Sequence, residues 1–298
     1  MIVKPQRADV GTVREMTREL HKKYPMLKVV PIGGSVLGRE IPAIILDKGE
    51  ETVLMAAAFH GQEWITSLVL LRLCEDICAA LAGGKPLDEL NVRRATGGRR
   101  LVLVPQVNPD GVDIAIHGAA SAGRLAPAVK CLGGDEPGRW QANARGVDIN
   151  HNFPAGWETL HKMEKSQGIT GPSPRQWGGP FPSSEPETAA MIRLCRRLCP
   201  RHVTALHTQG EEIYWKYGLC TPSQAHLMAQ VMADASGYRV ASPTGLASHG
   251  GFKDWFIEET GRPGFTLEMG KGENPLPLSD FEPMYKKARE MLLLAAFM

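Results

Sequence analysis

Four polar side chains that could do chemistry lie at or just beyond the ends of apolar segments. They are His60, Glu63, His207 and Glu268. His60 and Glu63 are three residues apart, so both side chains can point to one centre if a strand ends there and a helix begins. Two histidines and one carboxylate are the usual ligands of a catalytic zinc ion, and they also suit other divalent metals. The pattern predicts a metal site formed by the two histidines and Glu63.

The fourth residue, Glu268, has a different predicted role. A metal-dependent hydrolase needs a separate carboxylate that takes a proton from water and passes it to the leaving amine. Glu268 stands alone at the end of an apolar strand, where its pKa can be tuned. A His-x-x-Glu sequence by itself is most often a surface turn. It gains weight here because His207 and Glu268 also end apolar segments.

The elements that must position these residues alternate between apolar and amphipathic patterns. We expect a hairpin over 27–46, strands over 51–59, 99–108, 202–208 and 263–270, and helices over 9–24, 63–82, 185–197, 222–236, 253–259 and the C-terminal residues. This alternation predicts an α/β fold whose mixed, mostly parallel sheet has helices on both faces. Ligands of such sheets bind at the carboxyl ends of the strands, where the four residues lie.

Domain organisation follows from the same pattern. No linker divides the chain, so residues 1–298 are expected to form a single domain, with residues 1–26 as an N-terminal helical segment packed on it. Residues 118–185 are rich in Gly, Pro, Trp and Ser and show little periodicity. A structureless stretch of that length inside a compact domain is usually functional.

Composition excludes several classes of protein. Lys and Arg total 34 against 32 for Asp and Glu, a balance that argues against binding to nucleic acid or to a membrane surface. No apolar run is long enough to span a membrane, and the first residues lack the apolar region of a signal peptide. The six cysteines lack metal-site spacing and are expected to be free thiols. These features predict a cytoplasmic protein and indicate no oligomeric state.

Seven sequence blocks, in this order, resemble the zinc carboxypeptidase family from about Pro31 to the C-terminus. They are FHGQEW (59–64), VNPDG (107–111), RGVDINHNFP (145–154), SEPET (184–188), ALHTQGEEIYW (205–215), GGFKDW (250–255) and GFTLEMGKG (264–272). The resemblance implies a mixed eight-stranded sheet between helices. It also implies one zinc ion held by His60, Glu63 and His207, with Glu268 as general base and acid.

Longer stretches are similar to one bacterial branch of that family, the γ-D-glutamyl-meso-diaminopimelate peptidases. They are HGQEWITS, LHTQGEEIYWKYG, SHGGFKDWF and GKGENPLPLSDF. Enzymes of this branch cut peptidoglycan stem peptides between D-glutamate and diaminopimelate, and some carry LysM repeats, which this sequence lacks. The resemblance implies a peptidoglycan-derived peptide as substrate.

The block around residue 150 departs from the carboxypeptidase pattern. That family has Asn-Arg-Asn-Phe where this chain has Asn150-His151-Asn152-Phe153. Asn150 can still donate hydrogen bonds to a substrate carboxylate. His151 cannot form the bidentate fork of an arginine, and it binds an anion best when protonated. The alternative is that His151 only packs locally.

Two further departures concern the oxyanion. The arginine that usually follows the family's tryptophan is replaced by Gln141, which could donate a weaker, neutral hydrogen bond. Arg145 is a candidate substitute, or it pairs structurally with a carboxylate. The tyrosine that caps the substrate aligns near Leu246, and the nearest polar replacement is His249.

Lys253 and Glu211 are the remaining candidates for binding substrate. Lys253 aligns with the base of the family's side-chain pocket, where a cation suits a substrate that carries a carboxylate on its side chain. The alternative is a solvated lysine on a helix. Glu211 follows His207 closely, and it could orient a ligand, bind an amino group of the substrate or lie on the surface.

The leading hypothesis is therefore a zinc metallopeptidase that hydrolyses the γ-D-glutamyl–meso-diaminopimelate bond through a zinc-activated water molecule. The runner-up is an ordinary metallocarboxypeptidase that releases C-terminal amino acids. A deacylase of N-acyl amino acids ranks lower because those enzymes lack the VNPDG and SEPET blocks. A sensor that binds muropeptides without cutting them ranks lower too, because it would be free to lose Glu268.

Overall fold

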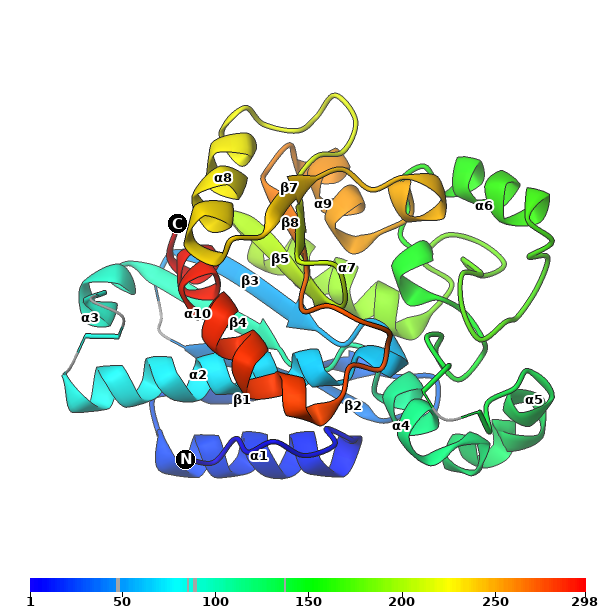
Figure 1. The fold of residues 1–298 in the computed structure, drawn as a ribbon, viewed down its shortest axis with the longest axis horizontal. Coiled ribbons are helices and arrows are strands. Elements are labelled where there is room, and N and C mark those ends of the chain that lie inside the picture. The colour runs from blue at the N-terminus through cyan, green and yellow to red at the C-terminus, as the bar shows by residue number, and fades with distance from the viewer. Residues whose placement is uncertain (47–48, 85, 88–89, 137) are drawn as a thin grey trace.

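In a computed structural model, which describes residues 1–46, 49–84, 86–87, 90–136 and 138–298, one eight-stranded sheet forms the centre of the molecule (Figure 1). The strands are β1 (Lys28–Gly34), β2 (Glu40–Leu46), β3 (Glu51–Ala57), β4 (Arg99–Val104), β5 (His202–His207), β6 (Glu212–Tyr214), β7 (Arg239–Ala241) and β8 (Gly264–Glu268). They lie in the order β1-β2-β4-β3-β5-β8-β6-β7. The α-helices are α1 (Val10–Lys23), α2 (Ile65–Gly83), α3 (Val92–Ala95), α4 (Pro109–His117), α5 (Ala126–Cys131), α6 (Trp157–Ser166), α7 (Pro186–Leu198), α8 (Gln224–Ser236), α9 (Phe252–Thr260) and α10 (Phe281–Phe297).

The pairing is mixed, as the sequence predicts. Strand β3 pairs in parallel with β4 and β5, and β5 pairs in parallel with β8. The outer pairs β1–β2, β2–β4 and β6–β8 are antiparallel, whereas β6–β7 is parallel. The four central parallel strands therefore end at one edge of the sheet, which is the edge where ligands bind in α/β folds.

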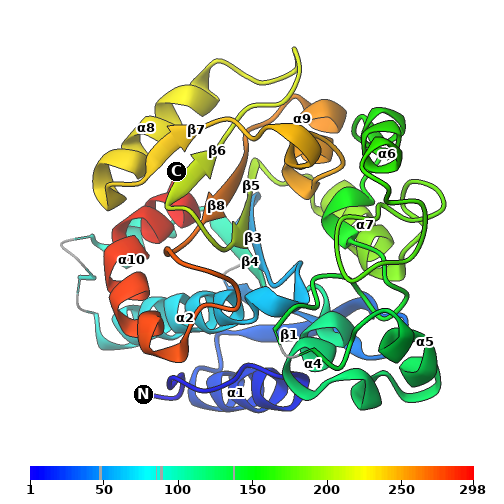
Figure 2. The same cartoon turned by 45° about the vertical axis from the view of Figure 1, so that its right-hand side comes forward.

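Helices cover both faces of the sheet (Figure 2). Helices α1, α2, α8 and α10 contribute to the larger buried core on one face, and α7 and α9 contribute to the core on the other. Because both faces are covered, the central strands are buried on both sides. Every residue of β5 is buried, and so is every residue of β3 after the first. The predicted fold class is confirmed.

The N-terminal segment is tied to the rest of the molecule. Helix α1 begins after Asp9, whose carboxylate accepts the N–H of Thr12, and it buries one apolar side. Ahead of the helix, the Glu75 carboxylate accepts the backbone N–H groups of Ile2 and Val3. The chain therefore packs on α2 from its second residue onward.

The sequence analysis is wrong about residues 118–185, because they are not structureless. They include α5, α6 and two 3-10 turns, and the sequence analysis also misses α4, β6 and β7. Strands β6 and β7, with three residues each, are too short for a periodic pattern. Short helices are stabilised by tertiary contacts more than by their own propensity. No helix of the described residues is long and apolar enough to cross a membrane.

Glu187, in the first turn of α7, gives the fold a measurable pH dependence. Its side chain is fully buried and accepts the N–H of Val36. Burial, with the nearby carboxylates of Asp110 and Glu185, raises the pKa of Glu187 from its ordinary 4.5 to about 8. The folded protein thus holds this proton more tightly than the unfolded chain, and its stability falls as the pH rises from 4.5 to about 8.

We therefore predict that Glu187→Gln flattens the pH dependence of stability, because glutamine carries no ionisable group. Between about pH 5 and pH 8, the melting temperature of the wild type should fall by about 5 °C more than that of the variant. Thermal denaturation of both proteins across this range measures the difference. Equal slopes for the two proteins would contradict the assignment.

Candidate active site

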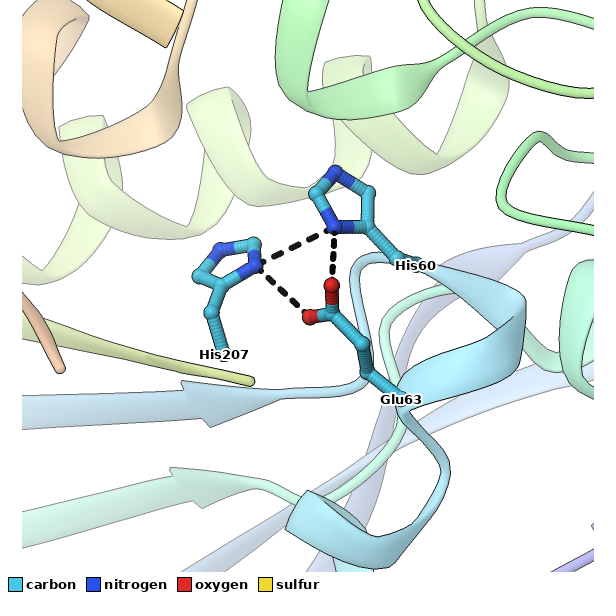
Figure 3. A group of neighbouring side chains, drawn as sticks. All are labelled: His60, Glu63 and His207. Atoms are coloured by element: carbon cyan, nitrogen blue, oxygen red, sulfur yellow. Dashed lines mark hydrogen bonds and ion pairs between the residues drawn. The ribbon is translucent and has the colours of Figure 1, made fainter. Parts of the chain in front are cut away.

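His60, Glu63 and His207 form a compact cluster (Figure 3). The Nδ1 atom of His60 lies 2.8 Å from Glu63 Oε1, and the Nδ1 atom of His207 lies 3.0 Å from Glu63 Oε2. The two Nδ1 atoms are 3.3 Å apart. The structure therefore brings together the three ligands that the sequence predicts, two from the turn after β3 and one from the end of β5.

The cluster fits a metal ion. Ligands about 2.0–2.1 Å from a tetrahedral zinc ion lie roughly 3.3 Å from one another, which is the distance between the two Nδ1 atoms. In the described part of the chain, this is the only group of three or more His, Cys, Asp or Glu residues with donor atoms close enough to share an ion. The neighbouring rings of His60 and His207 lower the pKa of Glu63 in spite of its burial, which favours the ionised form that a metal ligand needs.

The local fold explains how two ligands come from one turn. His60 follows β3, and Gly61–Glu63 form a 3-10 turn that leads into α2. A Cβ atom on Gly61 would lie 2.2 Å from the carbonyl oxygen of Gly111 and 2.8 Å from that of Trp140. The turn is therefore pressed against two other backbone segments, and only glycine allows that approach.

Asp148 contacts the ring of His60 on the side away from the other two ligands. Its Oδ1 atom lies 3.2 Å from His60 Nε2, on the side of the ring opposite Glu63. Its Oδ2 atom accepts a hydrogen bond of 2.7 Å from the Gln141 side chain. The charges of His151 and His60 hold the pKa of Asp148 below its ordinary value in spite of burial. A carboxylate in this position fixes the ring orientation of a metal-binding histidine.

Glu268 lies beside the cluster because of strand register. In the parallel pair β5–β8, Glu268 is the partner of His207, so both side chains leave the sheet on the same face. Burial and the charge of Glu63 raise the pKa of Glu268 well above its ordinary value. A carboxyl group that both accepts and returns a proton benefits from such a shift.

A cavity of about 150 Å³ opens beside His60 and Glu268. Seven of the predicted site residues line it: His60, Gln141, Asn150, His151, His249, Lys253 and Glu268. The cavity also has Asp254 in its wall, a residue that the sequence analysis does not single out. A space of this size suits one side chain of a substrate.

Most of these polar groups are held by a second contact. The Asn150 side-chain oxygen accepts the N–H of Phe252 at the start of α9, so its amide N–H groups remain for a ligand. His249 Nδ1 lies 3.0 Å from the hydroxyl of Tyr217. Gln141 uses one of its two amide N–H groups on Asp148. The cavity is therefore rich in hydrogen-bond donors.

Lys253 is buried rather than solvated, so the alternative of a surface lysine is wrong. Its side chain is 4% exposed, and its Nζ atom forms an ion pair with Asp254, which is itself 2% exposed. Nζ also donates to the carbonyl oxygen of Lys216 at 3.0 Å. The wall of the cavity thus carries a matched cation and anion.

Two predicted residues lie elsewhere. Arg145 is half-exposed and lies 3.6 Å from the buried carboxylate of Glu185. Glu211 forms ion pairs with Lys271 at 2.9 Å and Lys287 at 2.6 Å. Neither lines the cavity beside His60. The structure therefore does not bring them together with the other candidates, and their roles toward a substrate remain predictions.

A larger groove of about 750 Å³ lies next to the same cluster. It is lined by Gln62, between the ligands His60 and Glu63, and by Asn274, whose amide nitrogen is 3.5 Å from Glu63 Oε1. Gln176 lines both the groove and the small cavity. His60 therefore lines the small cavity, and its close neighbour Gln62 lines the larger groove.

The sequence analysis misses three polar residues close to the ligands or in the cavity wall. Their only sequence signal is that they stand in the stretches that resemble the family. Asp148 stands in RGVDINHNFP and Asp254 in GGFKDW, but nothing in their spacing distinguishes them from structural residues. Asn274 stands in GKGENPLPLSDF, where likewise nothing in the spacing singles it out. Their positions beside the ligands come only from the tertiary structure.

Comparison with known proteins agrees with this geometry. Residues 13–291 match the profile of a protein family described as zinc carboxypeptidase. The chain is 35% identical over 295 residues to gamma-D-glutamyl-L-diamino acid endopeptidase 1 of Lysinibacillus sphaericus, covering 98% of this chain and 73% of that protein. It is 37% identical to an uncharacterized protein of Bacillus subtilis, covering 97% of this chain and 77% of that protein.

Solved structures show the same fold. Carboxypeptidase A from Helicoverpa armigera superposes with a TM-score of 0.73 at 20% identity, covering 98% of this chain and 73% of that chain. Murein-tripeptide amidase from Escherichia coli O157 superposes with a TM-score of 0.57 at 22% identity, covering 91% and 92%. At these identities the likeness supports the fold alone.

We predict that Gly61→Ala weakens metal binding, because the added Cβ must displace the turn that carries His60 and Glu63. Zinc affinity measured by chelator competition should fall at least about tenfold, together with thermal stability. Gly83→Ala is the matched control, since a Cβ at the end of α2 meets nothing within 4 Å. Wild-type affinity in the Gly61 variant would show that the turn tolerates the change.

We also predict that Asp148→Asn lowers zinc affinity by about 10- to 100-fold, because the amide keeps the shape but loses the charge facing His60. The exposed Asp135→Asn variant serves as control. Competition with a chromogenic chelator measures both. Unchanged affinity would mean that Asp148 supports only the loop in which it lies.

Proposed function

The chain belongs to the zinc carboxypeptidase family, and from that membership we propose that it hydrolyses the amide bond between the γ-carboxyl group of D-glutamate and a diamino acid in peptidoglycan stem peptides. The observation that carries the proposal is the small cavity, whose lining includes the metal ligand His60, Glu268 and the buried Lys253–Asp254 pair. The related Lysinibacillus protein, named for a γ-D-glutamyl–diamino acid bond, supports the same substrate class.

The charges of the cavity match the leaving half of that substrate. The side chain of diaminopimelate ends in a second amino-acid head, with one ammonium and one carboxylate group. Lys253 and Asp254 present one cation and one anion, both buried, where such a head would lie. A simple aliphatic side chain would lie against this charged pair without forming a hydrogen bond or an ion pair with it.

The acyl half of the substrate is assigned to the larger groove. A γ-linked D-glutamate keeps its free α-carboxylate and is joined to further residues of the stem. Arg139 and Arg175 line the groove, and both are exposed and able to bind carboxylates. The difference in size between groove and cavity supports cleavage near the end of a longer molecule.

One zinc ion would be held by His60, Glu63 and His207. When bound, it lowers the pKa of a water molecule and polarises the scissile carbonyl group. Glu268 takes a proton from the attacking water and returns it to the nitrogen of the leaving diamino acid. Gln141 is placed to donate its free amide N–H to the carbonyl oxygen, and Asn150 to donate to a substrate carboxylate.

The runner-up is a metallocarboxypeptidase that releases ordinary C-terminal amino acids. Asn150 and His151 both line the cavity and could bind a terminal carboxylate, which favours this reading. The charged pair at Lys253 and Asp254 argues against an apolar side chain there.

We also propose that the enzyme acts in the cytoplasm, which the six free cysteines support.

We predict that the zinc-loaded protein releases diaminopimelate from L-Ala-γ-D-Glu-meso-diaminopimelate and leaves an N-blocked ordinary dipeptide intact. Mass spectrometry with and without chelator measures both reactions, and chelator should abolish the release. Cleavage of the ordinary dipeptide alone would establish the runner-up. Cleavage of neither, by a protein that binds zinc, would favour a sensor without activity.

The same assay tests Glu268. Glu268→Gln should lose at least about a thousandfold in kcat while it still binds zinc, because the amide cannot accept the proton. Glu258→Gln, at the exposed end of α9, is the control and should keep full activity. Full activity in the Glu268 variant would remove that residue from the mechanism.

A further inference from the structure

Glu164 is a fully buried carboxylate that the mechanism does not use. It lies on α6 with no exposed surface. Its Oε1 atom is 3.0 Å from His151 Nδ1, and its Oε2 atom is 3.2 Å from His161 Nδ1. The backbone N–H of Gly178 also donates to Oε2 at 3.2 Å. A carboxylate is taken out of water at a high cost, so these contacts must serve to hold its charge.

The contacts of His151 fix the orientation of its ring. Nδ1 faces two acceptors, the Glu164 carboxylate at 3.0 Å and the carbonyl oxygen of Gln176 at 3.1 Å. Because both partners only accept, Nδ1 must carry a hydrogen. The ring lines the small cavity, and Nε2 is the nitrogen left for a ligand there.

The charge state of His151 then decides what it can bind. A neutral ring with its hydrogen on Nδ1 has a lone pair on Nε2, and that lone pair repels a carboxylate. An imidazolium ring donates from both nitrogens and attracts one. His151 can therefore act in place of the family's arginine only if it is kept protonated.

Charged groups face His151 from several elements. Asp148 lies on its own turn, Glu164 approaches from α6, and His60 faces it from the metal site. The Lys253–Asp254 pair of α9 lines the same cavity, as does His249. Burial lowers the pKa of His151, but Asp148 and Glu164 outweigh burial and His60, so the pKa lies above its ordinary value.

Asp148 and Glu164 differ in which histidine they contact directly. The oxygens of Asp148 are taken by His60, by the Gln141 amide and by backbone N–H groups. Glu164 is the carboxylate that contacts His151 directly. We propose that Glu164 is a positioning residue, which holds His151 as a cation with Nε2–H directed into the cavity, where it binds the carboxylate next to the scissile bond in the leaving half of the substrate.

The proposal rests on the proposed function, and it assigns a role to α6, within residues 118–185. Helix α6 lies in the stretch between β4 and α7 that the sequence leaves without a pattern. Its burial of Glu164 against His151 gives that helix a part in recognising the substrate. The Asn150 amide, which lines the same cavity, is a second donor for the same carboxylate.

The first test compares two substrates in the zinc-loaded enzyme. One carries a free carboxylate next to the scissile bond, and the other carries an amide there. In Glu164→Gln, the KM for the free carboxylate should rise about tenfold, the loss expected for one charge-assisted hydrogen bond, with kcat nearly unchanged. The KM for the amide should not change. The exposed Glu158→Gln variant on the same helix is the control.

Equal KM changes for both substrates would mean that Glu164 only supports the fold, and an unchanged KM for both would also overturn the proposal. A pH profile adds a second criterion. In the variant, the pH above which KM rises for the free carboxylate should move downward, because the imidazolium loses its neighbouring charge. A profile that does not move would contradict the assignment. Glu164→Asp, which keeps the charge, should restore part of the affinity.

A direct titration separates this inference from the proposed function. NMR of ring-labelled histidines in the whole protein should show a lower pKa for His151 in Glu164→Gln than in the wild type, whether or not any peptide is cut. A shifted pKa of His151 together with no cleavage of either substrate would contradict the proposed function and still support the pairing of Glu164 with His151. An unshifted pKa would remove the inference even if the peptide is cut.

Discussion

The parallel pairing of β3, β5 and β8 carries the chemistry of this protein, because parallel strands end at the same edge of a sheet. The turn after β3 supplies His60 and Glu63, while His207 and Glu268 end neighbouring strands in register. His207 thus lies within hydrogen-bonding distance of Glu63, which is 144 positions away along the chain, and Glu268 ends the neighbouring strand. The position of each depends on a strand buried on both faces, which leaves little freedom to shift.

Around this edge, buried charges are arranged in pairs. Asp148 faces His60, Glu164 faces His151, and Asp254 faces Lys253. Each pair has at least one member that is almost fully buried, so removal of one partner would leave the other charge uncompensated. Such pairs hold side chains in one orientation, and that orientation is what recognition of a small polar substrate requires.

Under the proposed function, other hydrogen-bond donors take the place of the arginines that the family resemblance implies. At the positions where the zinc carboxypeptidases that this sequence resembles have arginines, this chain has His151 and Gln141. A buried carboxylate contacts each of them. The predicted substitute Arg145 instead lies near Glu185, at the surface. A histidine supported by a glutamate binds a carboxylate only while it is protonated, so this site couples recognition to pH in a way that an arginine does not.

The sequence alone determined the α/β class, the positions of the central strands and the four residues at their ends, because buried parallel strands read as apolar runs and the chemistry follows directly after them. It did not determine β6 and β7, which have only three residues each, or α6, which lies within a segment rich in Gly, Pro, Trp and Ser. Nor could it distinguish Asp148, Glu164 and Asp254 from other acidic residues, or show that Lys253 is buried and paired. Those facts depend on which segments pack against one another, and only the tertiary structure decides that, because a side chain's partner and burial are set by residues far away along the chain.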